Sequence, residues 1–161
     1  MLKKVISSFC LVLGLFVCLN TIWIQPSLAD LRQHEFVPGE MIYQSRQSLR
    51  DIDRHPWQIV VFKKVAGERV SNVQLRLVGF PDQVEFKHPA DLIVRTRTGQ
   101  DFQVSDQFAE QAPAPNVGQY DVTEILPLLP TDEPIILELP TKQAVTLKIP
   151  VSVILEWQAI A

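Results

Sequence analysis

The sequence is poor in cysteine, in basic residues and in the motifs that mark common enzymes. Its two cysteines, Cys10 and Cys18, both lie in an N-terminal segment that we expect to be removed. The remaining domain then has no disulfide, no thiol nucleophile and no Cys metal ligand. Its stability must come from the burial of apolar side chains alone.

The shortage of basic residues argues against two classes of partner. The chain has 15 Lys and Arg against 18 Asp and Glu, and two of the lysines, Lys3 and Lys4, belong to the segment expected to be removed. Nucleic-acid binding needs clustered Lys and Arg to displace counterions. Adhesion to an anionic membrane needs the same cluster. We therefore expect neither partner.

Long hydrophobic runs are absent except at the N-terminus, where residues 1–29 are predicted to be a helical signal peptide. Lys3–Lys4 precede an apolar run over residues 5–19, and the small residues Ser27 and Ala29 occupy the two positions that a signal peptidase recognises. Cleavage is expected directly after Ala29, which makes the protein an exported one.

The alternative for this segment is an uncleaved membrane anchor. Extended through Ile24, the apolar run approaches the roughly 20 residues that a bilayer requires. The polar pair Asn20 and Thr21 interrupts it, which favours the cleaved signal and no stable membrane span after cleavage.

The rest of the chain predicts an all-β fold. We expect a flexible N-terminal arm over residues 30–40 and a single domain over residues 41–161, an antiparallel β-sandwich or small barrel of seven to nine short strands with one short helical turn. The strands are expected at 41–50 (peripheral), 57–65 (central, because it is apolar on both faces), 73–77, 84–88, 92–96, 101–104, 135–139 and 145–159, and the helical turn within 120–129, where Asp121 and Glu124 fit a capping box.

The segment from Val145 to Ala159 has the longest regular pattern, because every odd position in it is apolar. A period of two predicts a strand with one buried face. Fifteen extended residues would span about 50 Å, longer than a domain of this size. We therefore predict two strands, Val145–Ile149 and Val151–Ala159, with a bend at Pro150, which cannot donate to a ladder.

Asp51, Asp53 and His55 are the candidates for a metal site. On an extended backbone the three side chains would point the same way and could hold a divalent ion. Pro56 and the turn composition predict a bent segment that scatters them. We therefore assign no metal site.

Other chemical candidates have simpler explanations. His34 lies in the arm, and His88 ends a predicted strand with no carboxylate close in sequence on its face, so both are expected to be ordinary histidines. Trp57 and Trp157 are expected in the core, with a sugar-stacking platform as the alternative. The serines Ser45, Ser48, Ser71, Ser105 and Ser152 lack the surroundings of a nucleophile. No catalytic or cofactor-binding residue is assigned.

The proline-containing segment over residues 110–119 is predicted to be a loop, because it cannot pair as a strand. Pro113 and Pro115 could offer an extended ligand to a partner, but a plain surface loop is the simpler interpretation.

Several strings resemble a family. They are residues 43–51 (YQSRQSLRD), 57–58 (WQ), 62–63 (FK), 75–81 (LRLVGFP) and 118–121 (GQYD). Together they resemble a group of small exported cyanobacterial proteins classed as a domain of unknown function. The resemblance implies export to the periplasm or the thylakoid lumen and says nothing of a reaction or ligand. The chain departs from it before Trp57, where a Gly is expected and the sequence reads Asp53-Arg54-His55-Pro56, which leaves the geometry of that turn open.

These observations lead to three functional hypotheses. The first is a non-catalytic exported β-sandwich that binds a protein partner, as an accessory or assembly factor of a membrane complex in the lumen or periplasm. The second is a carrier of a small apolar or carbohydrate ligand, because inward apolar positions look the same whether they contact each other or a ligand. The third is an enzyme that uses two carboxylates brought together by folding.

Overall fold

The structure is a computed structural model that describes residues 31–37, 39–108 and 112–161. The signal peptide predicted for residues 1–29 lies outside the described residues. So does the beginning of the loop predicted for residues 110–119.

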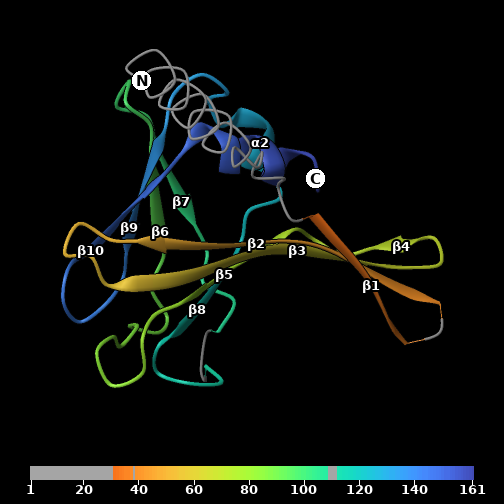
Figure 1. Cartoon of the computed structure of the whole chain (residues 1–161), viewed down its shortest axis with the longest axis horizontal. Coiled ribbons are helices and arrows are strands. Elements are labelled where there is room, and N and C mark those ends of the chain that lie inside the picture. The colour runs from red at the N-terminus through yellow and green to blue at the C-terminus, as the bar shows by residue number, and fades with distance from the viewer. Residues whose placement is uncertain (1–30, 38, 109–111) are drawn as a thin grey trace, which may run out of the picture.

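Two antiparallel sheets make up the fold, which confirms the all-β prediction. The large sheet contains, in spatial order, β1 (Leu31–Val37), β2 (Glu40–Arg50), β3 (Pro56–Ala66), β5 (Gln74–Val78) and β8 (Val117–Asp121), with β4 (Arg69–Val70) paired to β3. The small sheet contains β10 (Val145–Ile149), β9 (Ile135–Leu139), β6 (Leu92–Arg95) and β7 (Asp101–Val104). Figure 1 shows the strands of the two sheets crossing at a steep angle, as in orthogonal sheet packing.

The long strand β3 is the centre of the large sheet, as its continuous apolar run predicted. It pairs with β2 along its whole length and with β5 over Gln58–Phe62. Trp57, Ile59 and Val61 point into the core and are at most 1% exposed. Val60, on the opposite face, is also buried, which explains why the run is apolar on both faces.

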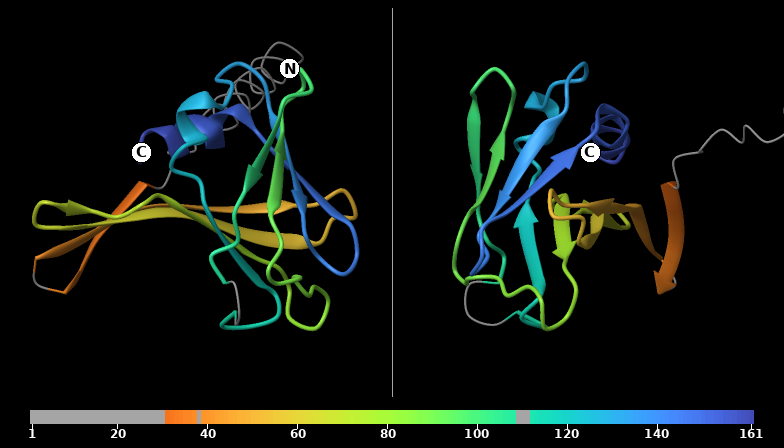
Figure 2. Two further views of the ribbon diagram at one scale, coloured as in Figure 1. Left: turned by 180° about the vertical axis from the view of Figure 1, so that it is seen from behind. Right: turned by 60° about the vertical axis from the view of Figure 1, so that its left-hand side comes forward.

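The core lies between the two sheets and beneath two short helices, η1 (Leu126–Leu128) and α2 (Val151–Gln158). Strands contribute alternate residues to it, as a half-buried sheet requires. In the second view of Figure 2 the small sheet stands on the left, the large sheet extends to the right, and α2 lies above. The most deeply buried large side chains are Trp57, Trp157, Tyr120, Ile59, Leu75, Leu77, Leu92, Leu126, Ile135, Leu137, Leu147 and Ile149.

The largest departure from the sequence prediction comes after Pro150. The chain bends there and β10 ends at Ile149, as predicted, but the second strand is wrong because Val151–Gln158 is the helix α2. The buried residues after Pro150 include Val153, Ile154, Trp157 and Ile160. Their spacing of one, four and seven defines one side of a helix.

Three further strand predictions are corrected. Residues 30–40, predicted to be an arm, contain β1, which pairs with β2, so β2 is not peripheral along that part. Val84–His88, predicted to be a strand, form only a single bridge between Phe86 and Thr141. Val117–Gln119, predicted to lie in a loop, belong to β8, because pairing with β5 outweighs the weak strand propensity of Gly and Gln.

The short helical turn predicted within 120–129 is present as η1. Tyr120 and Asp121 complete β8, and only η1 is helical in this region. Asp121 does not form the predicted capping box, because its carboxylate accepts hydrogen bonds from the backbone N–H and the hydroxyl of Thr123. Gln158 fastens α2 to the η1 segment by donating from Nε2 to the carbonyl oxygens of Leu126 and Leu129, at 2.9 and 3.1 Å.

Candidate functional site

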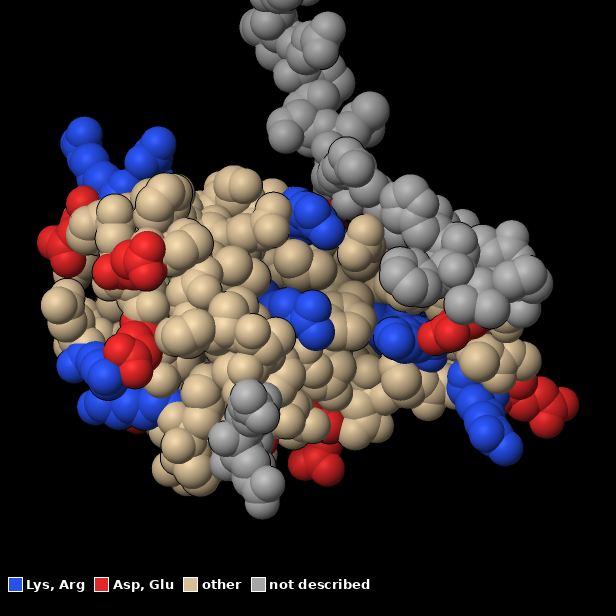
Figure 3. Space-filling view, turned by 90° about the horizontal axis from the view of Figure 1, so that it is seen from below, with Lys and Arg blue, Asp and Glu red and all other residues tan. Residues whose placement is uncertain are grey.

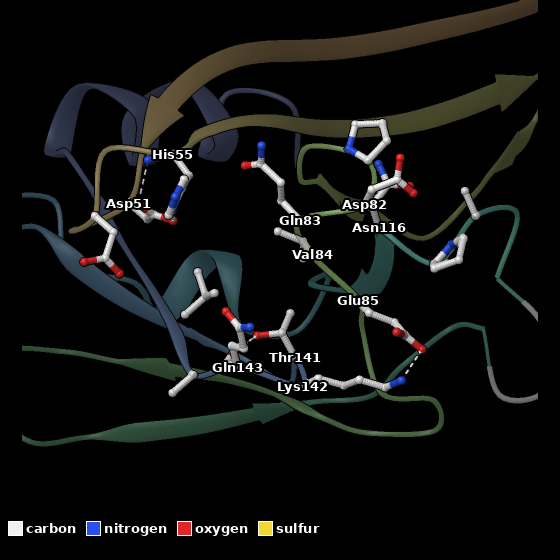
Figure 4. A pocket seen from close by; sticks show the side chains of 16 residues that line it. Asp51, His55, Asp82, Gln83, Val84, Glu85, Asn116, Thr141, Lys142 and Gln143 are labelled. Atoms are coloured by element: carbon white, nitrogen blue, oxygen red, sulfur yellow. Dashed lines mark hydrogen bonds and ion pairs between the residues drawn. The ribbon is translucent and has the colours of Figure 1, made fainter.

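An open cleft of about 1120 Å³ lies at one end of the sandwich, where four connections meet. These are the β2–β3 turn, the β5–β6 connection, the loop before β8 and the β9–β10 turn. Figure 4 shows the side chains that line it, most of them polar. The lining residues with charged or amide side chains are Asp51, Asp53, His55, Asp82, Gln83, Glu85, Asn116, Lys142 and Gln143.

Backbone hydrogen bonds tie three of these walls together. The N–H of Lys142 donates to the carbonyl of Glu85 at 2.9 Å, and the N–H of Phe86 donates to the carbonyl of Pro115 at 2.8 Å. Asn116 and Gly79 bond to each other twice, at 3.0 Å through the Gly79 N–H and at 2.8 Å through the Asn116 side chain. The cleft is therefore a preformed feature of the fold.

Asp51 holds the fourth wall of the cleft, the β2–β3 turn, in place through hydrogen bonds. Its Oδ1 accepts the backbone N–H of His55 at 2.8 Å, its Oδ2 accepts Nε1 of Trp57 at 3.1 Å, and His55 Nδ1 lies 3.3 Å from Oδ2. Burial by itself would raise the pKa of Asp51. The hydrogen bonds from Trp57 and His55 and the charge of His55 outweigh it and hold that pKa below its ordinary value.

The turn before Trp57 has the geometry that a glycine would suit. Arg54 has a φ of 68°, in the left-handed region, at the place where the resemblance leads us to expect Gly. Its N–H donates to the carbonyl of Asp51 at 3.1 Å, and its own carbonyl accepts Nη1 of Arg50 at 2.8 Å. These two bonds hold Arg54 in its left-handed conformation.

The three candidate metal ligands are not gathered around one point. Asp51 is turned towards Trp57, Asp53 is exposed, and the His55 side chain is 54% exposed. Within residues 31–37, 39–108 and 112–161, no group of three or more potential His, Cys, Asp or Glu ligands occurs.

The carboxylates of the cleft are held separately. Glu85 pairs with Lys142 at 2.7 Å, while Asp51 bonds within its own turn. In Figure 4 Asp51 and Asp82 lie on opposite sides of the cleft. A carboxyl that serves as a general acid needs a raised pKa, whereas that of Asp51 is lowered.

His88 has a carboxylate partner that the sequence did not reveal. Its Nδ1 lies 2.5 Å from Oδ2 of Asp106, and the two side chains are only 13% and 2% exposed. Asp106 also accepts the N–H of Ala90 and that of Phe108. The pair ties the β5–β6 connection to the segment after β7, and neither residue lines the cleft. Its two members are 18 residues apart, so no local spacing pointed to it.

The two tryptophans lie in the core, as predicted. Trp57 is 1% and Trp157 2% exposed, so neither presents a ring face to a sugar. Among the candidate serines, Ser45 is buried, Ser48, Ser71, Ser105 and Ser152 are exposed, and no Ser–His hydrogen bond occurs in the described part of the chain. The side chain of His34 lies outside what the structure describes.

Fold and site together define a β-sandwich with a preformed polar cleft between its end loops. Residues 29–160 match the family described as "Protein of unknown function (DUF3122)", and the chain belongs to this family. No curated protein and no solved structure matches the chain. Among the described residues, no helix has both the length and the apolar character to cross a membrane.

Proposed function

We propose that this is an exported, non-catalytic protein that binds a protein partner through the end cleft, as an accessory or assembly factor of a membrane complex in the periplasm or thylakoid lumen. The observation that carries the proposal is the combination of the preformed polar cleft with exposed apolar side chains on its loops. Ile52 is 76% exposed and Phe80 52% exposed, and each is next in sequence to a residue that lines the cleft.

Exposed apolar side chains beside polar groups are typical of protein interfaces. Such interfaces combine a small apolar centre with a polar rim and about one hydrogen bond per 100–200 Å². Ile52 and Phe80 would supply the apolar contacts, and the exposed amides Gln83 and Gln143 would supply hydrogen bonds from two different walls. A partner that presents a loop or chain terminus fits an open cleft of this size.

The lining argues against the alternative ligands. No Trp, Tyr or Phe is among the described residues that line the cleft, so it offers no stacking surface to a sugar. An apolar ligand would need a mostly apolar wall, whereas ten of the sixteen lining residues are polar. Among the three functional hypotheses we therefore rank carriage of a small ligand second and carboxylate-dependent catalysis third.

The test compares two cleft-side variants with a matched control. Ile52→Ser and Phe80→Ser remove exposed apolar side chains at the cleft, and Val70→Ser removes one that is 63% exposed on β4, at the opposite end of the molecule in Figure 1. Tagged full-length proteins are cross-linked in native membranes and purified, and the recovered partner is then measured against each purified variant.

We expect Ile52→Ser and Phe80→Ser to weaken binding at least tenfold each, about 1.4 kcal/mol, and Val70→Ser to leave it unchanged. Equal binding by all variants would show that the interface does not lie at the cleft. A protein recovered alone under every detergent and growth condition would refute protein binding altogether. Export is checked separately by mass spectrometry, which should find a mature chain beginning at Asp30.

A further inference from the structure

A second surface lies on the outer face of the large sheet, away from the core. The strand register places Arg46 of β2 opposite Val60 of β3, Val60 opposite Arg76 of β5, and Arg76 opposite Gln119 of β8. Adjacent strands are about 4.8 Å apart, so the backbones of the two arginines lie about 10 Å apart on either side of Val60. We call these four residues, with Gln58 and Phe62 beside them on β3, the outer-face patch.

Several basic side chains lie on this side of a protein whose net charge is −3. Figure 3, which views the molecule from below the large sheet, shows Lys and Arg atoms across the middle of the face and Asp and Glu atoms nearer its margins. The carboxylates at the two ends of this face, those of Glu40 and Asp121, already have partners within the protein. Glu40 pairs with Lys64 at 3.7 Å, and Asp121 is bonded to Asn72 and Thr123.

The two arginines of the patch have no carboxylate partner within the described residues. Arg46 is exposed, and no ion pair or hydrogen bond of its side chain is formed there. Arg76 donates from Nε and Nη2 to the side-chain oxygen of Gln119, at 2.9 and 2.6 Å. A guanidinium has five N–H donors, so three of those on Arg76 are left for another acceptor.

Arg76 is also held in place before anything binds. Its guanidinium carbon lies 5.4 Å from the centre of the Phe62 ring, and Gln119 is steadied in turn by its contact with Gln74 at 3.4 Å. Ordering a long side chain on binding normally costs about 0.5–1.5 kcal/mol. The contacts with Phe62 and Gln119 already restrict the Arg76 side chain, so binding would order it little further.

We propose that the outer-face patch docks an acidic α-helix of a partner protein, independently of the end cleft. The patch extends about 14 Å across the strands, over three strand spacings, and a helix lying in that direction would cover it with about nine residues. Carboxylates at positions i and i+7 of a helix are about 10.5 Å apart on one side and would reach Arg46 and Arg76 together. Phe62, which is partly exposed on the same face, then contacts the helix between these two carboxylates.

A protein segment is favoured over other anions by the rest of the surface. A membrane or a nucleic acid presents a broad negative surface, which the acidic majority of this chain would repel. A single helix needs only the patch itself. The neutral amides of Gln58 and Gln119 also offer both donors and acceptors, which suit polar protein side chains.

The test uses a labelled helical peptide, rich in alanine, with Glu at positions i and i+7, and the same peptide with Gln at both. Binding to the full-length protein is followed by fluorescence anisotropy at low and moderate salt. The variants are Arg46→Gln alone and together with Arg76→Gln. The charge-matched control, Arg97→Gln with Lys148→Gln, removes two exposed cations from other parts of the molecule.

We expect the Glu peptide to bind at least about tenfold more tightly than the Gln peptide, and added salt to weaken it. Arg46→Gln should lose that preference in part and the double variant completely, while the control keeps it. Because Arg46 has no partner among the described residues, its variant remains informative even if loss of Arg76 lowers stability. The Ile52→Ser variant should bind the Glu peptide as the wild type does. Failure of this proposal can therefore be distinguished from failure of the function proposed for the cleft.

Three results would overturn the proposal. The first is no binding of the Glu peptide by the wild-type protein. The second is an equal loss in the charge-matched control. The third is binding of phosphatidylglycerol vesicles or of a single-stranded oligonucleotide through Arg46 and Arg76 without binding of the peptide.

Discussion

Two buried clusters of this molecule each combine a carboxylate with a tryptophan, and they differ in how completely their polar atoms are paired. In the Asp51 cluster (Asp51, His55, Trp57) both carboxylate oxygens and the indole N–H are hydrogen-bonded. In the Glu156 cluster, formed by Glu156 and Trp157 of α2 with Ser45 and Gln47 of β2, only one carboxylate oxygen is bonded, to Nε2 of Gln47 at 2.7 Å. The other oxygen, the indole N–H of Trp157 and the hydroxyl of Ser45 are buried without a partner among the described residues.

The difference arises from how far apart in sequence the partners lie. The Asp51 cluster closes a turn within six residues, so its geometry is set locally. The Glu156 cluster joins residues 109 positions apart, and its fit depends on how the whole helix α2 settles on β2. A buried polar group without a partner costs about 1–3 kcal/mol. We therefore expect the cleft wall to be fixed firmly and α2 to be attached less firmly.

The largest expected effect is that of Asp51→Ala. The substitution leaves the buried indole N–H of Trp57 and the N–H of His55 without acceptors, and we expect a loss of about 2–4 kcal/mol in the free energy of unfolding. Urea denaturation measures it. The control is Asp53→Ala, an exposed change in the same turn that should cost less than about 0.5 kcal/mol. Equal values for the two variants would show that the Asp51 cluster does not hold the turn.

Acid should remove the contribution of Asp51. Because the pKa of Asp51 is lowered by folding, the carboxylate stabilises the native state above the ordinary pKa of 3.8, and that stability is lost as the pH falls through the folded value. Asp51→Asn should be less stable than wild type at pH 7, and the gap should close below about pH 3.8. Unfolding curves from about pH 7 to about pH 2.5 test this; a constant gap would mean that charge plays no part.

The Glu156 cluster should tolerate replacement far better. In the double variant Gln47→Leu with Glu156→Leu, an incompletely paired buried group gives way to apolar side chains, which can be nearly neutral or stabilising. We expect a change within about 1 kcal/mol, with α2 retained in the circular dichroism spectrum. A loss as large as that of Asp51→Ala would show that the bond from Gln47 to Glu156 is essential and would remove the contrast between the clusters.

The smallest effect is expected at Pro150→Ala. Pro150 has a φ of −71°, which its ring already favours, so the substitution mainly increases the freedom of the unfolded chain and should cost about 0.4–1 kcal/mol. Helix content should be unchanged, because α2 is held by Val153, Ile154 and Trp157. Loss of the helical circular dichroism signal in this variant would instead show that Pro150 is required for α2 to form.

Sequence reasoning succeeded where the signal was local or strong. The central position of β3 followed from its apolar run, and the β6–β7 hairpin followed from Gly99 between two short strands. Both tryptophans were placed in the core from the parity of a predicted strand. That reason holds for Trp57, whereas Trp157 is buried on the helix α2, so its placement is right and its predicted strand is wrong.

The cleft and the outer-face patch lay beyond sequence reasoning for a physical reason. The cleft is assembled from four loops, and residues as distant as Asp51 and Lys142 line it together. The patch depends on strand register, because only the pairing of β2, β3 and β5 aligns Arg46 with Arg76 across Val60. Likewise, nothing near His88 in the sequence indicated Asp106.

The sequence by itself determined that residues 145–149 form a strand and that the chain turns at Pro150, because a proline cannot continue a ladder. The conformation of the residues after Pro150 was decided only by the tertiary structure. Their alternating apolar pattern predicted a strand, but β9 ends its pairing at Ile135, opposite Ile149, just after Pro134, so no partner strand lies ahead. The segment instead forms a helix that lies beside β2 and η1, and Val153, Ile154 and Trp157 on it are buried.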